Sequence, residues 1–544
     1  MSEPIGYIVG ESEPNSFMFV VDPKNIPPIL EYVCVYVEEE VEGERLKIPV
    51  LAQIQRIIQS NPLLDKNASS EAVSKIAVNF NVCHVVAQAR VLGFPYRGKV
   101  YYPRYAPRPG SPVYRAPSSL LRQLYYIEPD SAIHIGYLIN RPDVEVYLDV
   151  RGFGRHVAIL AATGAGKSHT AGVIIEELLK KGATILAIDP HGDYSRMYER
   201  RDGGVYEFSD RITLLSVGPY QRFGKPYYIR VADLTDDEIA YMAGIPSKAT
   251  NIRRVLSLAI RRAREMHKDT GSFDLDELIT ILEKWSEGEI EAPYSKRLSK
   301  NLKDSCFNAI KYLERLKKLR VFSVDSVPLR EILKPMHLTV LNLTGVPFEA
   351  QDIVVYHILK RVFEARVNAI TNSPGEKFPF PVFVIIEEAH RFAPPKRETY
   401  SASIIRTLAS EGRKFGVYLV VITQRPSKID SDILSQCQSQ IVLRIVNPVD
   451  QRTISESSEA FSEPLLENLP GLNVGEAVIV GPIVKTPVIV KVRQRETKHG
   501  GMDLPIVELL RRAKEEAMRE LNIDESRVHD IIVRIRKELR GELN

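Results

Sequence analysis

Hydrophobic and polar positions divide the chain into stretches of different periodicity. Residues 1 to about 110 hold short runs of β-branched and aromatic residues separated by turn residues, for example 16–22 (SFMFVVD) and 31–39 (EYVCVYVEE). Such runs are typical of short strands. The pattern therefore predicts a small β-barrel at the N-terminus.

The segment 101–119 is rich in Pro, Tyr and Arg. Because proline has no backbone N–H and fixes φ, we expect neither a helix nor a central strand there. We interpret the segment as a linker. Its arginines and tyrosines contact either nucleic acid or a neighbouring part of the protein.

From about residue 135, apolar runs alternate with helical patterns. Residues 156–194 are typical of strand, glycine loop, helix and strand, which form one βαβ unit of a parallel sheet. Helical periodicity fills about 236–319, and buried strands resume after it. The segment 475–496 is typical of a β-hairpin. The predicted fold class is α/β, with an inserted helical subdomain.

These changes in pattern predict five parts. They are an N-terminal barrel with its linker (1–119), the first part of the α/β core (120–235), an inserted helical subdomain (236–320), the second part of the core (321–500) and a C-terminal helical tail (501–544). The tail either braces a neighbouring subunit or caps its own domain.

Composition narrows the class of protein. A chain of 544 residues with 44% hydrophobic and 26% charged residues is typical of a soluble protein of several domains. Its apolar runs are too short to cross a bilayer and its N-terminus lacks a signal-peptide pattern, so we expect a cytoplasmic protein with no membrane partner. With a net charge of +4, any nucleic-acid contact must come from a local cluster or from several subunits. The four cysteines are far apart, which argues against zinc and disulfides.

The clearest chemical motif is the glycine loop AATGAGKSH at 161–169. It lies between an apolar strand and a helix, where successive backbone N–H groups face phosphate oxygens. Ala161 replaces the first glycine of the usual pattern. Lys167 is expected to contact the β- and γ-phosphates of ATP, and Ser168 to bind Mg²⁺. The expected nucleotide-binding residues of the loop are Thr163, Gly164, Ala165, Gly166, Lys167, Ser168 and His169.

Two carboxylates end a buried run at 382–388, VFVIIEE. In a parallel sheet, such a strand delivers them to the same edge as the phosphate loop. Glu387 is expected to orient the water shell of Mg²⁺, although aspartate is more usual there. Glu388 is the candidate general base for the attacking water. The alternative is a solvated pair at the start of a loop.

Polar residues near three other strands extend the candidate site. Gln424 follows the apolar run 416–422 and is a candidate sensor of the γ-phosphate, unless it belongs to a plain turn. Arg413, in SEGRKFG, is a candidate arginine finger for a neighbouring subunit, with a surface ion pair as the alternative. Asp189, in IDPHGDY, accepts from the catalytic water, couples the site to the subunit interface, or caps the turn before Pro190. This segment lacks the spacing of a metal site.

Together these segments resemble the HerA family of P-loop ATPases. AATGAGKSHT, DPHGDY, VFVIIEEAHRF, SEGRKFG, VITQRPSKID and LPGLNVGEAVIVG follow the family's order over almost the whole chain. The resemblance implies a RecA-like P-loop ATPase core and a hexameric ring with ATP at the subunit interfaces. It also implies nucleotide contacts for Arg155 and for Lys491.

The resemblance further implies a function. HerA proteins move double-stranded DNA through the ring and work with the NurA nuclease in DNA end resection for recombinational repair. We therefore expect an ATP-dependent DNA helicase or translocase with ATP and Mg²⁺ as cofactors. Its expected partners are double-stranded DNA, a NurA-type nuclease and further copies of itself in a homo-hexamer. The alternative is an ATP-driven motor, or an ATP-switched assembly protein, for another cargo.

The basic segment 390–400 (HRFAPPKRETY) is the candidate DNA contact. In a ring, Arg391, Lys396 and Arg397 of all subunits form a positive collar for DNA phosphates. We expect this loop to be flexible and to face the pore. An ordinary exposed loop is the alternative.

Overall fold

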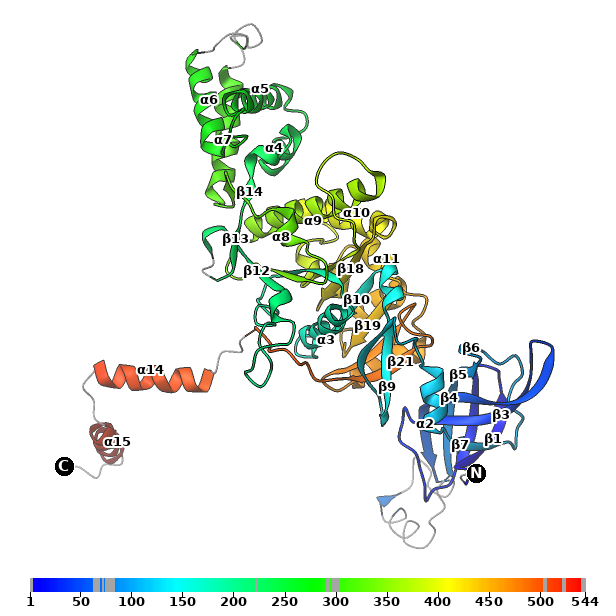
Figure 1. The fold of residues 1–544 in the computed structure, drawn as a ribbon. Helices are drawn as coiled ribbons and strands as arrows, with labels where there is room; N and C mark the ends of the chain where they lie inside the picture. Colours follow the sequence, from blue (N-terminus) through cyan, green and yellow to red (C-terminus); the bar gives the residue numbers. More distant parts are fainter. Residues whose placement is uncertain are drawn as a thin grey trace. The chain divides into compact units, whose positions relative to one another are not determined.

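The computed structural model describes residues 3–61, 69–70, 73, 84–220, 223–289, 294, 303–501, 506–520 and 525–539. The chain divides into two units, Met1–His499 and Gly500–Asn544. The first unit holds the sheets and the candidate site. The second holds helices α14 (Ile506–Glu520) and α15 (Glu525–Leu539) (Figure 1). The boundary between the units lies next to the predicted start of the tail, and the rest of the five-part division stays a prediction.

The N-terminal strands close into a barrel, as their pattern predicts. Six strands pair in the order β2-β1-β7-β3-β4-β5, and β5 pairs again with β2 to complete the ring. Val33, Val35 and Val37 are buried in its apolar interior. The strands are β1 (Gly6–Ser12), β2 (Ser16–Val21), β3 (Tyr32–Val41), β4 (Glu44–Ser60), β5 (His84–Tyr96), β7 (Pro112–Arg115) and the appended β6 (Lys99–Tyr101).

The prediction that 101–119 is a linker with neither a helix nor a central strand is wrong. Pro112–Arg115 forms β7 between β1 and β3, and helix α2 (Ser118–Leu124) follows. Pro112 is the first residue of its strand and Pro117 is the N-cap of α2. At both positions the missing N–H of proline leaves the hydrogen-bonding pattern intact. The segment therefore contributes a strand to the barrel, between β1 and β3.

A twelve-stranded sheet forms the core, in the order β13-β12-β16-β11-β17-β18-β10-β19-β20-β21-β8-β9. The strands from β13 to β19 in this order are parallel, and the remaining strands extend the sheet antiparallel. The β20–β21 pair is the hairpin predicted from the sequence. The bounds are β8 (Ala132–Leu138), β9 (Arg141–Asp149), β10 (Val157–Leu160), β11 (Thr184–Asp189), β12 (Ile212–Val217), β13 (Lys225–Tyr227), β16 (Leu338–Asn342), β17 (Val382–Ile386), β18 (Val417–Thr423), β19 (Ser439–Leu443), β20 (Glu476–Val480) and β21 (Val488–Val492).

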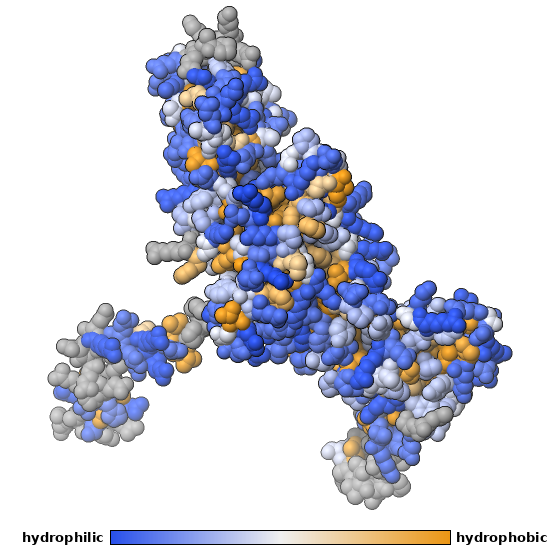
Figure 2. All heavy atoms as spheres, viewed as in Figure 1, coloured by the Kyte–Doolittle hydropathy of each residue, from blue (hydrophilic) through white to orange (hydrophobic). Residues whose placement is uncertain are grey.

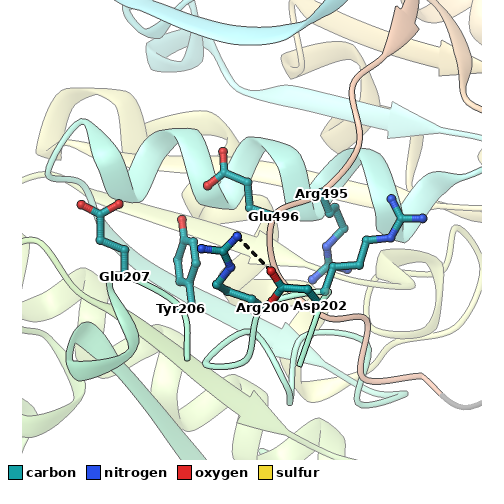
Figure 3. A pocket seen from close by; sticks show the side chains of 7 residues that line it. Arg200, Asp202, Tyr206, Glu207, Arg495 and Glu496 are labelled. Atoms are coloured by element: carbon teal, nitrogen blue, oxygen red, sulfur yellow. Dashed lines mark ion pairs between the residues drawn. The ribbon is translucent and has the colours of Figure 1, made fainter. Parts of the chain in front are cut away.

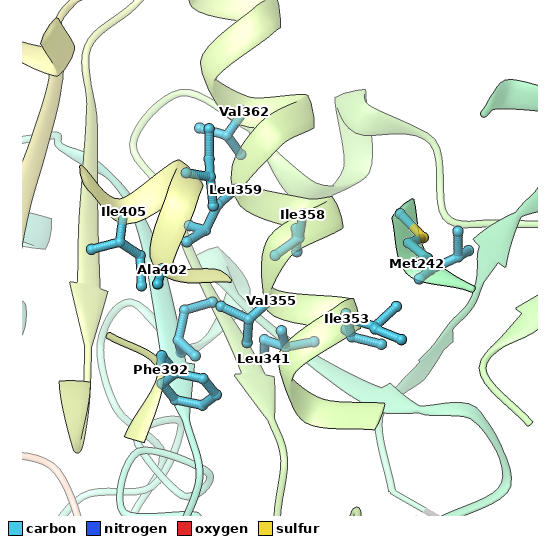
Figure 4. Close-up of a cluster of buried hydrophobic side chains, with 14 of the residues drawn as sticks. Met242, Leu341, Ile353, Val355, Ile358, Leu359, Val362, Phe392, Ala402 and Ile405 are labelled. Atoms are coloured by element: carbon cyan, nitrogen blue, oxygen red, sulfur yellow. The ribbon is translucent and has the colours of Figure 1, made fainter. Parts of the chain in front are cut away.

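Helices cover both faces of the parallel strands. Every residue of β10, β11 and β17 is buried, as expected for strands enclosed on two sides. On one face, α9 (Phe348–Thr371) and α10 (Tyr400–Phe415) form a cluster in which Leu359 lies beside Ile405 (Figure 4). On the other face lies α3 (Lys167–Lys180). The sheet is thereby fixed from both sides, and so are the loops at its ends.

The predicted helical insertion is present in the first unit. Its first helix begins with a capping box, in which Thr235 and Glu238 satisfy each other's backbone N–H groups. The helices are α4 (Asp236–Met242), α5 (Thr250–Met266), α6 (Leu275–Glu287) and α7 (Lys303–Lys318). Short strands β14 (Ile229–Arg230) and β15 (Phe322–Ser323) pair where the chain enters and leaves the insertion.

Short helices complete the first unit. They are α8 (Leu329–Ile332), α11 (Ser431–Gln436), α12 (Pro448–Ser457) and α13 (Glu463–Asn468). Hydrophilic side chains cover most of the face shown in Figure 2. Within the described ranges, no helix combines the length and the apolar character that crossing a membrane requires.

Candidate active site

The glycine loop joins the carboxyl end of β10 to the first turn of α3. Gly166 is the N-cap of α3 and has a φ of 103°, which residues with a Cβ rarely adopt. No side chain caps this helix end. The first N–H groups of α3 and the positive end of its dipole therefore remain available to an anion. The segment Thr163–His169 has the geometry that binds a phosphate group.

Ala161, the departure from the usual loop pattern, is fully buried. Its N–H donates to the carbonyl of Thr423 at 3.3 Å, and the Ala162 N–H donates to the carbonyl of Arg444 at 2.9 Å. Hydrogen bonds thus hold the start of the loop against the ends of β18 and β19. Because the backbone of Ala161 has no positive φ, this position does not require glycine.

Lys167, Glu387 and Glu388 meet at the carboxyl edge of the sheet. The Lys167 ammonium forms an ion pair with Glu387 Oε1 and lies 3.3 Å from Glu388 Oε1. The side chains of the three residues are 10%, 0% and 5% exposed, respectively. Little water screens these charges, so they interact strongly. The structure therefore brings together the lysine and the two carboxylates that the sequence analysis proposed.

Glu388 has an unusual backbone and an unpartnered oxygen. Its φ is 51°, in the left-handed region that residues with a Cβ adopt only at an energetic cost. Such strain is concentrated at functional sites. Its Oε2 atom is buried and has no hydrogen-bond partner among the described residues. A buried carboxylate oxygen without a donor is suited to accept a proton from water.

Tyr194 fixes the orientation of Glu387, a role that the sequence analysis missed. The Tyr194 hydroxyl donates to Glu387 Oε2 at 2.5 Å, and both side chains are fully buried. Burial raises the pKa of Tyr194 well above its usual value, so the phenol stays protonated and donates. The available signal was only the position of Tyr194 in the turn that follows β11, because the pairing of β11 with β17 is visible in the structure alone.

Asp189 holds that turn. Its Oδ1 accepts from the N–H groups of Gly192 at 2.8 Å and Asp193 at 3.0 Å, and its Oδ2 accepts from the Tyr194 N–H at 2.9 Å. Burial raises the pKa of Asp189 to about 7, although these three donors oppose the shift. Of the roles considered for Asp189, the structure displays the turn-forming one, and its effect is to place Tyr194 against Glu387.

Gln424 lies at the end of β18, between β10 and β17 in the sheet. Its Oε1 accepts a hydrogen bond from the Thr163 hydroxyl of the glycine loop. The residue before it, Thr423, is hydrogen-bonded through Oγ1 to His390 Nδ1 at 2.9 Å. An amide at this point touches the loop directly, so a sensing role for Gln424 stays a prediction with suitable geometry.

Arg155 and Arg413 lie at the opposite edge of the sheet. Arg155 lies two residues before β10, and Arg413 lies in the last turn of α10, just before β18. These are the amino ends of the strands, whereas the glycine loop follows the carboxyl end of β10. A strand of four residues separates the two edges by about 13 Å. The structure therefore does not bring either arginine together with its own glycine loop.

Those two arginines differ in their contacts. Arg155 donates to Gln438 Oε1 at 3.1 Å. Arg413 is exposed, and no ion pair or hydrogen bond of its side chain is found with the described residues. The surface ion pair considered as the alternative for Arg413 is thus not seen among them.

Lys491, from the hairpin, and His169, from the start of α3, lie where the hairpin side of the sheet meets the glycine loop. The Lys491 ammonium donates to the Val474 carbonyl at 2.6 Å, and the next residue, Gly475, donates its N–H to the Ala165 carbonyl at 3.0 Å. The His169 ring bonds through Nε2 to the Arg493 carbonyl at 2.9 Å, and burial lowers its pKa. Both side chains lie next to the loop, and their contact with nucleotide stays a prediction.

The basic segment after Glu388 is anchored at both ends. Phe392 is fully buried, and the Thr399 hydroxyl bonds to its carbonyl. The guanidinium groups of Arg391 and Arg397 each lie 5.6 Å from the centroid of the Phe348 ring. These contacts hold parts of the loop in place, and the expected flexibility of the loop stays a prediction. Lys396, at the exposed part of the loop, remains available to a ligand.

A separate pocket of about 510 Å³ contains none of the predicted site residues (Figure 3). It lies between the segment 200–207 and the residues that follow β21, and Arg200 and Asp202, both on the first segment, form an ion pair at 3.0 Å. Among the described residues, no group of three or more His, Cys, Asp or Glu side chains is arranged to hold a metal ion. The glycine loop remains the best-supported site.

Comparison with known proteins gives consistent matches. Residues 133–362 match the family described as "Helicase HerA, central domain". A probable helicase of Methanocaldococcus jannaschii is 32% identical over 517 residues, covering 93% of this chain and 94% of the relative. The "DNA double-strand break repair helicase HerA" of Pyrococcus furiosus is 32% identical over 576 residues, covering 96% of this chain and 100% of the relative.

A solved structure gives a more distant match. The plasmid coupling protein TrwB in complex with ADP and Mg²⁺ aligns with a TM-score of 0.47 and 13% identity. The alignment covers 70% of this chain and 93% of TrwB.

Proposed function

Because this chain belongs to the HerA family, we propose that it hydrolyses ATP to drive movement along double-stranded DNA in DNA repair. The observation that carries the proposal is the meeting of Lys167, Glu387 and Glu388 at the edge where the glycine loop and α3 begin. Family relatives named as DNA double-strand break repair helicases support the substrate.

The residues at this edge fit ATP and Mg²⁺. The uncapped start of α3 and the positive φ of Gly166 suit a phosphate cradle. Bound ATP and Mg²⁺ supply the phosphoryl group and neutralise the charge on its oxygens. Lys167 binds the phosphates, while Ser168 and Glu387 hold the metal and its water shell.

Glu388 and Gln424 act on the reacting end of the nucleotide. Glu388 Oε2, buried and without a donor, accepts the proton of the attacking water. Gln424, which already bonds to Thr163 of the loop, contacts the γ-phosphate and registers its loss. Both groups lie at the ends of rigid strands, so their positions are set before the nucleotide binds.

A ring of six subunits completes each site. Arg413 cannot serve its own glycine loop from the opposite edge of the sheet, so it stabilises charge in the site of a neighbour. Arg155 lies at the same edge and faces the same neighbour. Such head-to-tail contacts generate rings when the rotation closes. The resemblance to HerA proteins supports six as the number of subunits.

The basic loop binds DNA, and a partner nuclease acts with the protein in DNA end resection. Lys396, with Arg391 and Arg397 beside it, offers positive charge to DNA phosphates, which gives binding that is sensitive to salt and nearly independent of sequence. The loop follows Glu388 directly, so a change at the nucleotide is transmitted to the DNA contact. We propose a NurA-type nuclease as the partner in DNA end resection, as in the HerA proteins that the chain resembles.

The test is ATP hydrolysis by the full-length protein with and without linear double-stranded DNA, for the wild type and Glu388→Gln. We expect DNA to stimulate the wild type, and the variant to lose about 100-fold or more in rate while still binding ATP. The matched control is Glu398→Gln, whose side chain is 80% exposed on the following loop. An ATP hydrolysis rate that DNA does not change would indicate another cargo. The absence of ATP hydrolysis in the wild type would refute the proposal.

A further inference from the structure

His390 occupies a position that the proposed reaction does not use. It lies in the short 3₁₀ helix Ala389–Arg391 after β17, and its side chain is 15% exposed. Its Nδ1 atom is 2.9 Å from Thr423 Oγ1 and 3.2 Å from Glu388 Oε2. One ring nitrogen therefore lies within reach of both the end of β18 and the candidate base.

The two neighbours compete for this nitrogen. Burial is the largest cause and lowers the pKa of His390; the charge of Glu388 opposes this shift, and the charges of Arg425, Arg391 and Lys167 add to it. The ring is then neutral at neutral pH and carries one N–H. Thr423 Oγ1 already accepts from the Arg425 N–H at 3.0 Å, whereas Glu388 Oε2 has no hydrogen bond among the described residues. With its proton on Nδ1, the ring can donate to either oxygen, and a small movement would transfer the bond from the first to the second.

Glu388 needs a hydrogen-bond donor when the Lys167 ammonium binds the phosphates of the nucleotide. In the structure, Glu388 Oε1 lies 3.3 Å from the Lys167 ammonium. If that ammonium contacts the nucleotide, the buried carboxylate loses its nearest positive charge, which is unfavourable unless another donor replaces it. His390 is the donor already within 3.2 Å.

The same nitrogen links Glu388 to the candidate sensor. Thr423 and Gln424 are consecutive at the end of β18, and Gln424 bonds to Thr163 of the glycine loop. Contacts therefore run from the loop through Gln424 and Thr423 to His390, and from His390 to Glu388. A change at the γ-phosphate reaches the base through side chains at adjacent strand ends.

We propose that His390 is a positioning residue that holds Glu388 through an Nδ1–H bond shared with Thr423. It acts through Glu388 and does not touch the nucleotide. The proposal rests on the proposed ATP hydrolysis and adds the residue that sets the orientation of the base.

The test compares His390→Ala, His390→Asn and His390→Gln in the full-length protein. Asparagine places its amide nitrogen near the position of Nδ1, whereas glutamine places its amide nitrogen near Nε2. We expect His390→Ala and His390→Gln to lower kcat about 10- to 100-fold with little change in KM for ATP, and His390→Asn to restore most of the rate. Thermal unfolding of each variant separates loss of fold from loss of positioning.

A double-mutant cycle with Thr423→Val tests the shared bond. If His390 and Thr423 act along one path, the double variant is no slower than His390→Ala alone. A wild-type kcat in His390→Ala would overturn the proposal, as would a loss that asparagine fails to restore or one matched by a lower melting temperature. Absence of hydrolysis in the wild type would instead refute the proposed function itself.

Discussion

Tyr194 and Glu387 are joined by a 2.5 Å hydrogen bond between two fully buried side chains that lie 193 positions apart in the sequence. The bond leaves Glu387 with one oxygen held by a phenol and the other facing Lys167. The orientation of the carboxylate proposed to hold the metal therefore depends on a residue from another strand end.

Removing this phenol should weaken metal use. We expect Tyr194→Phe to keep the fold and to reduce the apparent affinity for Mg²⁺, or the rate at fixed Mg²⁺, by about 10- to 100-fold. The measurement is the Mg²⁺ dependence of ATP hydrolysis. Tyr206→Phe is the matched control, because the Tyr206 hydroxyl is buried without a hydrogen-bond partner among the described residues. An unchanged Mg²⁺ dependence in Tyr194→Phe would contradict the role given to this bond.

Arg413 should act only across a subunit interface. Lys167→Ala and Arg413→Ala should each abolish hydrolysis, with ATP binding largely kept in the second. Mixing the two inactive proteins should restore activity, because some interfaces then combine an intact glycine loop with an intact arginine. The measurement is ATP hydrolysis over a series of mixing ratios, with the adjacent exposed Lys414→Ala as the control. Normal hydrolysis by Arg413→Ala alone would show that the assignment is wrong.

Lys396 should contribute to DNA binding through charge alone. We expect Lys396→Ala to weaken binding equally for unrelated duplex sequences, and to reduce the slope of log affinity against log salt by about 1. The control is Lys377→Ala, an exposed lysine before β17, at the opposite end of that strand. If the slope of log affinity against log salt were the same in both variants, the loop would not be the DNA contact.

Buried histidines should make the fold sensitive to mild acid. Burial is the main cause that lowers the pKa of His156 and His337 to about 4 and that of His357 to about 3. Above the ordinary pKa of 6.5 both folded and unfolded states are neutral, and stability is complete. As pH falls from about 6.5 to 4 only the unfolded state gains protons, so the free energy of unfolding falls.

His156→Asn isolates one of these contributions. The Leu419 N–H donates to His156 Nδ1 at 2.9 Å, and an asparagine oxygen replaces that acceptor. We expect denaturant unfolding of His156→Asn to lose less free energy between pH 6.5 and 4 than the wild type does. The exposed His191→Asn should follow the wild type, and an identical loss in His156→Asn would contradict the assignment.

The sequence predicted the parts of the site that depend on neighbouring residues. The glycine loop, the carboxylates Glu387 and Glu388, and the strands that carry them follow from local patterns of small, apolar and acidic residues. The parallel arrangement then fixes their common edge, because consecutive strand ends of such a sheet lie on the same side. The barrel is likewise predicted by short alternating runs.

Contacts between residues far apart in the chain could not be predicted from the sequence. Tyr194 meets Glu387 because β11 pairs with β17, and no spacing in the chain shows this pairing. The strand Pro112–Arg115 was not predicted because the surrounding segment is rich in proline. Pro112 is the first residue of the strand, where proline is tolerated. That Arg155 and Arg413 lie far from their own glycine loop could not be predicted without knowing the direction of the strands.

The placement of the glycine loop and the two arginines at opposite ends of the same strands has a consequence for stoichiometry. If the arginines serve a neighbour, each chain carries two halves of two different sites. An open row of subunits always leaves one loop and one arginine edge unmatched at its ends, and a single chain has no complete site. Only closure of the row makes the number of complete sites equal the number of chains, so the activity per chain should rise steeply with protein concentration and then become constant.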